Sequence, residues 1–321
     1  MAEFHVYSIP MPVRFRGLTR RTGVLFEGPA GWAEWSPFEE YGVAEAATWW
    51  RAAREAATTG YPQPVRSAIP VNVTIPAVDP ATAHRLALGS GCRTAKVKVG
   101  EPGQGLADDL ARVEAVRDAL GPAGRVRVDA NGAWDADMAV AALRELARFD
   151  LEYAEQPCPT VAELAEVRRK VARYSVRIAA DESIRRAGDP MAVVRAGAAD
   201  VAVLKVQPLG GVTACLRLAE SLGLDVVVSS AVETSVGLRA GIALAAALPE
   251  LEFACGLGTA ALLDGDVVAD PLTARDGVIE VRDVTPDPAL LDRHRADAAT
   301  AAWWERRLAD CRAHAQGGGD E

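Results

Sequence analysis

Six charged residues end short apolar runs in the middle of this 321-residue chain. They are Lys96 and Lys98 in AKVKVG, Asp129 in RVDANGAW, Glu155 in YAEQPC, Asp181 in IAADES and Lys205 in VLKVQPLGG. From Lys98 onward, consecutive members are 31, 26, 26 and 24 residues apart. A regular series of carboxylates with a lysine at each end is suited to proton transfer assisted by a cation.

The three carboxylates predict a metal site. A buried charge is costly unless it is paired or binds an ion, and three carboxylates that meet need a cation. Oxygen ligands without His or Cys favour Mg²⁺, and Mn²⁺ is an acceptable substitute. The alternative is that each acidic residue is a helix cap or a rim ion pair, which explains a single Asp or Glu better than three in consecutive units.

The two lysine positions predict the acid–base groups. A free lysine is almost fully protonated at neutral pH, so a lysine base needs a lowered pKa. Lys96 lies two residues before Lys98 on one strand face, and a like charge and a nearby metal ion both lower a lysine pKa. Lys98 therefore suits a general base. Lysines at strand ends more commonly extend to solvent, but this alternative poorly explains two lysines in AKVKVG.

The elements that carry these residues alternate between apolar runs and amphipathic stretches, which is typical of βα repeats. Helices are clearest over 106–120, 136–149, 160–173 and 211–222. Strands are predicted at 68–74, 94–99, 126–129, 153–155, 178–181, 201–205, 225–229 and 252–254. Eight strands indicate a closed barrel, and all six charged residues would then lie at its C-terminal mouth, where enzymes of this fold place their chemistry.

The flanking segments predict a second unit. Residues 3–35 read as strands with a hairpin around Gly28, Pro29 and Gly31, and residues 43–57 read as a helix. We therefore predict an α+β capping domain over residues 1–64 and a modified TIM-type (β/α)7β barrel over residues 65–255. A C-terminal segment over residues 256–321 is expected to return in part to the capping domain and to end in a disordered tail, QGGGDE.

Composition limits the class of protein. The net charge of −9 argues against a nucleic-acid surface, although a local site for a small anion can still be positive. The five cysteines form no C-x-x-C pair and read as reduced, structural thiols. No signal peptide or membrane span is evident, which predicts a cytoplasmic protein without a membrane partner. Oligomeric state stays open, and a monomer is compatible with the sequence.

The ordered motifs K-x-K, D-x-N, E-Q-P, D-E-S and a lysine before a G-G turn resemble the enolase superfamily, in its muconate-lactonizing subgroup. PMPVRFRGLTRRTGVLFE and GWAEWSPFEEY in the capping domain are similar to the o-succinylbenzoate synthases, particularly the actinobacterial type. The resemblance implies that Asp129, Glu155 and Asp181 bind Mg²⁺, rather than Glu182. It also implies that Lys98 removes the proton α to a carboxylate and that Lys205 stabilises the resulting enediolate from the other side.

The implied reaction is a hydro-lyase step of menaquinone biosynthesis. 2-Succinyl-6-hydroxy-2,4-cyclohexadiene-1-carboxylate would lose water by syn elimination, with Lys98 assisting the departing hydroxyl, to give o-succinylbenzoate. The partner would be a small anionic carboxylate. Supporting or substrate-binding roles are expected for Lys96, Arg127, Asn131, Ser229, Ser230 and Gly258, although the D-A-N-G sequence also suits a turn and an arginine on a strand also suits an ion pair.

Two other functions remain open at this point. An N-succinylamino-acid racemase or a dipeptide epimerase of the same superfamily would use the same barrel residues, with the two lysines exchanging a proton across a carbanion. A noncatalytic metal-binding barrel belongs to a different class of protein, and it gives no reason for lysines on both sides of a metal.

Overall fold

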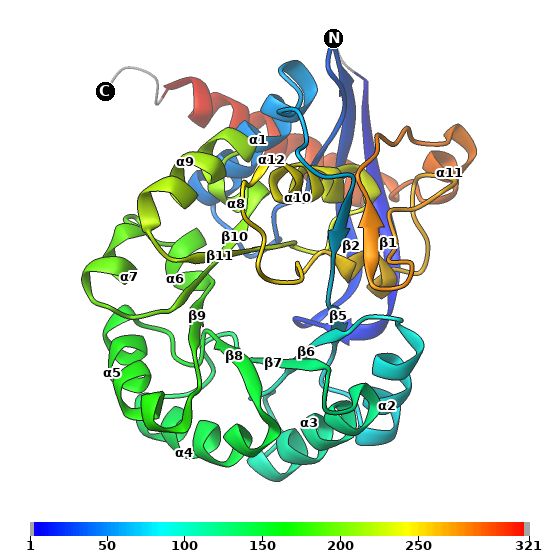
Figure 1. Cartoon of the computed structure of the whole chain (residues 1–321). Helices are drawn as coiled ribbons and strands as arrows, with labels where there is room; N and C mark the ends of the chain where they lie inside the picture. The colour runs from blue at the N-terminus through cyan, green and yellow to red at the C-terminus, as the bar shows by residue number, and fades with distance from the viewer. Residues whose placement is uncertain (1–2, 318–321) are drawn as a thin grey trace.

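The computed structural model describes residues 3–317 and contains a curled sheet of seven parallel strands (Figure 1). The order is β11-β10-β9-β8-β7-β6-β5, so strands that are consecutive in the chain are neighbours in the sheet. The strands are β5 (Val73–Ile75), β6 (Thr94–Lys98), β7 (Arg125–Asp129), β8 (Leu151–Glu155), β9 (Ile178–Ala180), β10 (Val201–Lys205) and β11 (Asp225–Ser229). The predicted α/β barrel architecture is thereby confirmed.

The barrel closes through two residues instead of a full eighth strand. Cys255 N donates to Pro70 O at 2.7 Å on one side, and Gly256 N donates to Val228 O at 2.8 Å on the other. The predicted strand over 252–254 is wrong, because the chain makes only isolated bridges there, at Cys255 and Gly256. The prediction of one strand over 68–74 is also wrong: β4 (Ala68–Pro70) pairs with the distant β12 (Val278–Glu280), and only β5 joins the barrel.

Helices cover the outside of the barrel (Figure 1), and most bury one apolar face, as α4 (Ala136–Leu146) does with Ala139, Ala142, Leu143 and Leu146. The prediction of a helix over 106–120 is confirmed, and those over 136–149 and 160–173 end in short 3₁₀ turns, η1 (Ala147–Phe149) and η2 (Ala172–Tyr174). Asp79, Asp135 and Thr160 cap three N-termini with side-chain oxygens. The helices are α2 (Pro80–Gly89), α3 (Leu106–Leu120), α4 (Ala136–Leu146), α5 (Val161–Val171), α6 (Glu182–Arg185), α7 (Met191–Arg195), α8 (Val206–Leu209), α9 (Val212–Leu222) and α10 (Ser235–Ala247).

A separate three-stranded antiparallel sheet lies beside the barrel. It is built from β1 (Phe4–Phe15), β2 (Leu18–Gly28) and β3 (Gly31–Trp35), and α1 (Val43–Thr58) packs on it. We call this sheet and α1 the cap. Its own core contains Trp35 and Trp49, both at most 1% exposed. The predicted hairpin around Pro29 is confirmed, since Gly28 pairs with Gly31.

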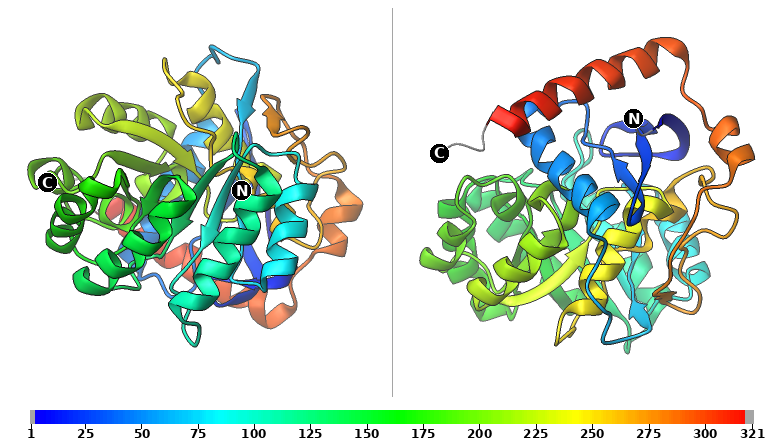
Figure 2. Two further views of the ribbon diagram at one scale, coloured as in Figure 1. Left: turned by 60° about the horizontal axis from the view of Figure 1, so that its bottom comes forward. Right: turned by 90° about the horizontal axis from the view of Figure 1, so that it is seen from above.

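The chain after the barrel passes through η3 (Gly258–Leu262), β12 and α11 (Pro288–Arg293), and then forms the long helix α12 (Ala298–Gly317). Figure 2 shows α12, in red, lying along the cap, and it contacts α1 and β1. Trp304 of α12 meets Trp35 edge to face, with ring centroids 5.3 Å apart. The N- and C-terminal segments thus share one core.

Other sequence-based expectations have mixed outcomes. The five cysteines are free and buried, as expected. Within residues 3–317 no helix combines the length and apolar character needed to cross a bilayer. Of the expected disordered tail, Gln316 and Gly317 belong to α12, and residues 318–321 lie outside the described part of the chain. The domain boundaries at residues 64 and 255 stay predictions.

Candidate active site

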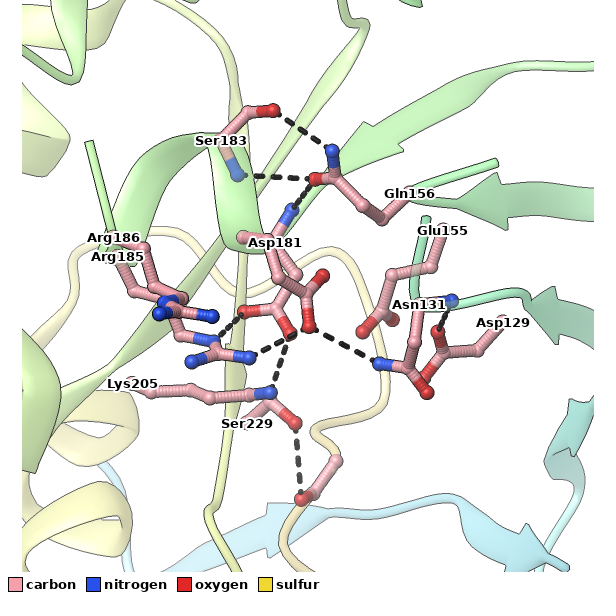
Figure 3. Close-up of polar contacts among 12 residues, drawn as sticks. Asp129, Asn131, Glu155, Gln156, Asp181, Ser183, Arg185, Arg186, Lys205 and Ser229 are labelled. Atoms are coloured by element: carbon pink, nitrogen blue, oxygen red, sulfur yellow. Dashed lines mark hydrogen bonds and ion pairs between the residues drawn. The ribbon is translucent and has the colours of Figure 1, made fainter. Parts of the chain in front are cut away.

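The predicted charged residues gather at the C-terminal ends of the barrel strands (Figure 3). Lys98, Asp129 and Glu155 are register partners across β6, β7 and β8, which places their side chains side by side at one level. Asp181 follows β9 directly, and Lys205 ends β10 on the far side. All three carboxylate residues are at most 1% exposed. The structure therefore brings together all five residues predicted for metal binding and proton transfer.

Each carboxylate is paired with a lysine. Lys96 Nζ lies 2.9 Å and 3.0 Å from the two oxygens of Glu155 and 3.2 Å from Asp129 Oδ2. Lys98 Nζ lies 2.6 Å from the same Asp129 oxygen, and Lys205 Nζ lies 2.6 Å from Asp181 Oδ2. These contacts form a buried network in which positive and negative groups alternate.

The two lysines of β6 differ in pKa although they are two residues apart. Burial lowers the pKa of Lys98 below its usual range, and the charge of Lys96 adds to this effect while Asp129 opposes it. For Lys96, burial is outweighed by Glu155 and Asp129, which raise its pKa well above the usual range. Lys96 therefore keeps its positive charge. Lys98 loses its proton more readily and is the lysine that can act as a base, which is the direction expected from the sequence.

The acidic residues differ as well. Burial and the neighbouring charge of Asp129 raise the pKa of Glu155 to about 7. The pKa values of Asp129 and Asp181 are lowered in spite of burial, because Lys98 and Lys96 act on the first, and Arg185 and Lys205 act on the second. The two aspartates are thus anionic, and Glu155 gains most from an additional cation.

The donor set fits a hard divalent cation in its chemistry. Among residues 3–317 no three acidic, His or Cys side chains are arranged to hold an ion at once, since lysine ammonium groups lie between the carboxylates. If Lys98 gives up its charge to act as a base, one positive charge is lost from this buried network. A cation held by carboxylate oxygens would restore the balance.

Gln156 shows why the E-Q-P and D-E-S motifs occur together. Its Oε1 accepts from the backbone N–H of Asp181 at 3.0 Å and of Ser183 at 3.1 Å, and its Nε2 donates to Ser183 Oγ at 2.8 Å (Figure 3). Glu155 precedes Gln156 in the chain, so one amide links the ends of β8 and β9. Sequence reasoning treated Gln156 only as part of a motif, whereas it positions the backbone of a predicted ligand.

Asn131 is both a turn residue and a neighbour of the charged side chains, which are the two roles suggested by the D-A-N-G sequence. Its φ of 47° is that of a turn, and its backbone N–H donates to Asp129 Oδ1 at 3.0 Å. Its side-chain oxygen accepts from Lys98, and its Nδ2 donates to Glu182 Oε1 at 3.2 Å. Asn131 therefore connects the predicted base with the residue beside the third predicted ligand.

Three of the residues expected to support the site divide into two groups. Ser229 and Ser230 line the cavity above the carboxylates, and Ser230 Oγ lies 2.6 Å from Thr259 Oγ1. Gly258 is not among the lining residues: it packs on the Asn72 carbonyl, 2.7 Å from where a Cβ would stand. The cavity is lined by Phe15, Arg16, Phe38, Thr74, Lys96, Lys98, Asp129, Asn131, Arg185, Lys205, Ser229, Ser230, Ala231, Val232, Gly256 and Thr259.

Arg127 does not point into the mouth of the barrel with Asp129. It is fully buried one layer below, where its Nε pairs with Glu152 at 2.5 Å and its guanidinium lies over the Tyr153 ring at 4.6 Å. Because side chains alternate along a strand, residues two apart share a face but stand at different depths in the barrel. The position favours the ion-pair interpretation of Arg127.

Sequence reasoning missed several residues of the site. Thr74 is the middle residue of β5 and is a polar residue in the apolar run VNVTIP, which is a usable signal. Arg185 lies one helical turn after Asp181, and its Nε pairs with Asp181 Oδ1 at 2.9 Å. Phe15 and Arg16 lie where β1 turns into β2, and Phe38 follows β3. These residues come together from distant parts of the chain, so no short stretch of sequence predicts their place in the site.

Comparisons with known proteins agree with this architecture. The enolase N-terminal domain-like family matches residues 6–57, and the enolase C-terminal domain-like family matches residues 80–288. Over 307 residues the chain is 62% identical to an o-succinylbenzoate synthase of Thermobifida fusca, covering 96% of this chain and 95% of that protein. Identity to an o-succinylbenzoate synthase of Mycobacterium tuberculosis is 53% over 311 residues, covering 96% and 93%.

Solved structures show the same fold. A muconate lactonizing enzyme from Pseudomonas fluorescens in complex with muconolactone superposes with a TM-score of 0.79 at 25% identity, over 92% of this chain and 98% of that one. A dipeptide epimerase from Enterococcus faecalis gives a TM-score of 0.70 at 22% identity, over 88% and 97%. With both domains matched and full-length relatives above half identity, the chain belongs to the enolase superfamily.

Proposed function

We propose that this chain is an o-succinylbenzoate synthase, a hydro-lyase that converts 2-succinyl-6-hydroxy-2,4-cyclohexadiene-1-carboxylate to o-succinylbenzoate and water. The observation that carries the proposal is 62% identity over nearly the whole chain to a protein of that name, together with a lysine on each side of a buried carboxylate cluster. The substrate is a small carboxylate, as for other members of the superfamily.

Lys98 supplies the proton chemistry in this proposal. Its Nζ, in the neutral form that burial favours, takes the proton from the carbon α to the ring carboxylate. The same proton is then given to the hydroxyl group on the adjacent ring carbon as the C–O bond breaks. The electron pair of the C–H bond completes the aromatic ring, and the leaving hydroxyl departs as water.

Lys205 has a different role, because its ammonium group already pairs with Asp181 at 2.6 Å. From β10 it faces the cavity opposite β6, where a fixed positive charge stabilises negative charge that develops on the substrate carboxylate. Asp129, Glu155 and Asp181 would hold Mg²⁺, or Mn²⁺ in its place, and a bound ion would add Lewis-acid stabilisation of the same charge.

The biological setting is part of the same proposal. We propose menaquinone biosynthesis as the pathway of the enzyme, with a small anionic carboxylate as its partner. The cytoplasmic location stays a prediction from the sequence, and a monomer is compatible with it.

A turnover assay tests the proposal against its rivals. The purified chain with Mg²⁺ is expected to consume the cyclohexadiene substrate, which is followed by loss of its ultraviolet absorbance and by mass spectrometry of o-succinylbenzoate. Inversion of N-succinyl amino acids or of dipeptides without dehydration would instead indicate the racemase or the epimerase. Absence of all three activities from folded, metal-loaded protein would support a noncatalytic barrel.

A further inference from the structure

We propose that Arg21 of the cap is a positioning residue for substrate binding, because it holds the strained loop Ala231–Val232 in place as one wall of the active-site cavity. The inference rests on the proposed function for its kinetic readout. Arg21 lies on β2 and is 2% exposed, and it does not line the cavity itself. Its effect must therefore pass through the residues that it contacts.

The first observation is the conformation of the loop that follows β11. Val232 has a φ of +62°, in the left-handed region, which is unfavourable for a β-branched side chain. Ala231 and Val232 both line the cavity, next to Ser229 and Ser230. A valine keeps such a backbone only when the surrounding structure determines it, and strain of this kind gathers at functional sites.

The second observation is that one guanidinium group binds the two carbonyls of this loop. Arg21 Nε donates to Val232 O at 2.9 Å, and its Nη2 donates to Ala231 O at 3.3 Å. The partners are 211 and 210 residues away in the chain, so these bonds join the cap to the barrel. Charge-assisted hydrogen bonds in a dry setting are among the stronger ones available to hold a backbone.

The same guanidinium is itself fixed within the cap. Nη1 donates to Thr22 O at 3.0 Å, and Nη2 donates to Ser36 Oγ at 3.0 Å as well as to the Ser36 carbonyl. It also lies over the ring of Phe38, 4.8 Å from its centroid, and Phe38 lines the cavity. Arg21 thus sets the distance between two walls of the cavity, the strained loop and an aromatic ring of the cap.

Two buried carboxylates hold the donors of the loop in a complementary way. Glu233 accepts from the Ala231 N–H at 2.7 Å, and Glu34 of β3 accepts from Thr234 N at 3.1 Å and from Thr234 Oγ1. The carbonyls of the loop accept from a guanidinium group, and the N–H groups of Ala231 and Thr234 donate to carboxyl groups, so its conformation is determined from both sides. Arg21 is the positive member of this arrangement.

Steady-state kinetics of Arg21→Met test the proposal. The variant keeps much of the side-chain length but loses every donor, so the loop should relax and KM should rise about tenfold, as expected for lost charge-assisted bonds. Turnover number should change less than about threefold, because Lys98 and Lys205 make no contact with Arg21. Arg21→Lys keeps the charge and one donor nitrogen, and should lie between wild type and Arg21→Met.

The matched control is Arg117→Met. Arg117 donates to the carbonyls of Phe149, Gly121 and Gly124 far from the cavity, so this variant loses comparable bonds and should keep the wild-type KM. Adding Val232→Gly to Arg21→Met should lower KM again, since glycine adopts a positive φ without the strain. A purely structural role for Arg21 would give no such rescue.

Amide hydrogen exchange gives a readout that needs no substrate. Arg21→Met should speed exchange of the Ala231 and Thr234 amides, whereas Arg117→Met should not. An unchanged KM, a fall in turnover number alone, or loss of thermal stability with wild-type kinetics would each overturn the proposal. If the wild-type protein does not dehydrate the cyclohexadiene, the proposed function is wrong. The positioning role is then tested by hydrogen exchange alone, and unchanged exchange in Arg21→Met would overturn it.

Discussion

The two sides of the cavity are built in different ways. On the barrel side, Lys98, Asp129 and Glu155 stand at the ends of adjacent parallel strands whose register is fixed by backbone hydrogen bonds. On the cap side, Phe15 and Arg16 come from the turn of a long hairpin, where the strand pairing is interrupted between Pro10 and Phe15. One wall is set by a regular sheet, and the other by a turn and by contacts between distant parts of the chain.

This difference separates two tasks. Groups that transfer protons must be held within a few tenths of an ångström, and strand ends of a barrel provide that precision. Groups that recognise the remainder of a substrate can come from a segment that varies, which is where loops are useful. The comparison predicts that changes on the barrel side lower turnover number, whereas changes on the cap side mainly raise KM.

The largest effect should come from Lys98→Ala. Loss of the proposed base is expected to lower the turnover number by about 10²- to 10⁴-fold, the usual contribution of a general acid–base group. The fold should be preserved, because Lys96 still pairs with Asp129 and Glu155. Steady-state kinetics measure the turnover number, and circular dichroism measures whether the fold is preserved. Wild-type turnover in this variant would show that Lys98 is not the base. It would also contradict the assignment of proton transfer to the barrel side and of substrate recognition to the cap side.

Metal removal should have the next largest effect. Exhaustive chelation is expected to lower activity by at least about a hundredfold, since Lewis-acid stabilisation of developing charge contributes several kcal/mol. Addition of Mg²⁺ or Mn²⁺ should restore it, and addition of Ca²⁺, which is larger, serves as the comparison. Full activity after chelation would mean that the lysine network alone neutralises Asp129, Glu155 and Asp181.

The barrel side could be predicted from sequence because its signals are local. Each charged residue directly ends an apolar run, and one occurs in each βα unit, so their convergence follows from the fold alone. Local patterns fail where the outcome depends on a distant partner. Nothing near Ala68 shows that β4 pairs with β12, and nothing near Glu252 shows that the chain makes only isolated bridges at Cys255 and Gly256.

The cap side was harder to predict for the same reason. That Arg21 meets Val232, or that Phe15 reaches Lys98, depends on how the cap packs against the barrel. The place of Arg127 was hard to predict for a related reason, because its depth in the barrel depends on Tyr153 and Glu152 in the layer below. The alternation of residues along a strand predicts the face on which a side chain lies. Its depth in the barrel depends on the side chains with which it can pair.

The smallest effect should come from Phe15→Leu, which tests the cap side alone. The Phe15 ring centroid lies 5.2 Å from Lys98 Nζ, and leucine keeps an apolar wall but loses the cation–π contact. KM is expected to rise about threefold, in line with the modest energy of such a contact at a partly exposed site. Turnover number should stay within about twofold of wild type, because Lys98 keeps its contacts with Asp129 and Asn131, and steady-state kinetics measure both. A loss of turnover as large as that of Lys98→Ala would show that the cap also positions the base, and the two walls of the cavity would then share one task.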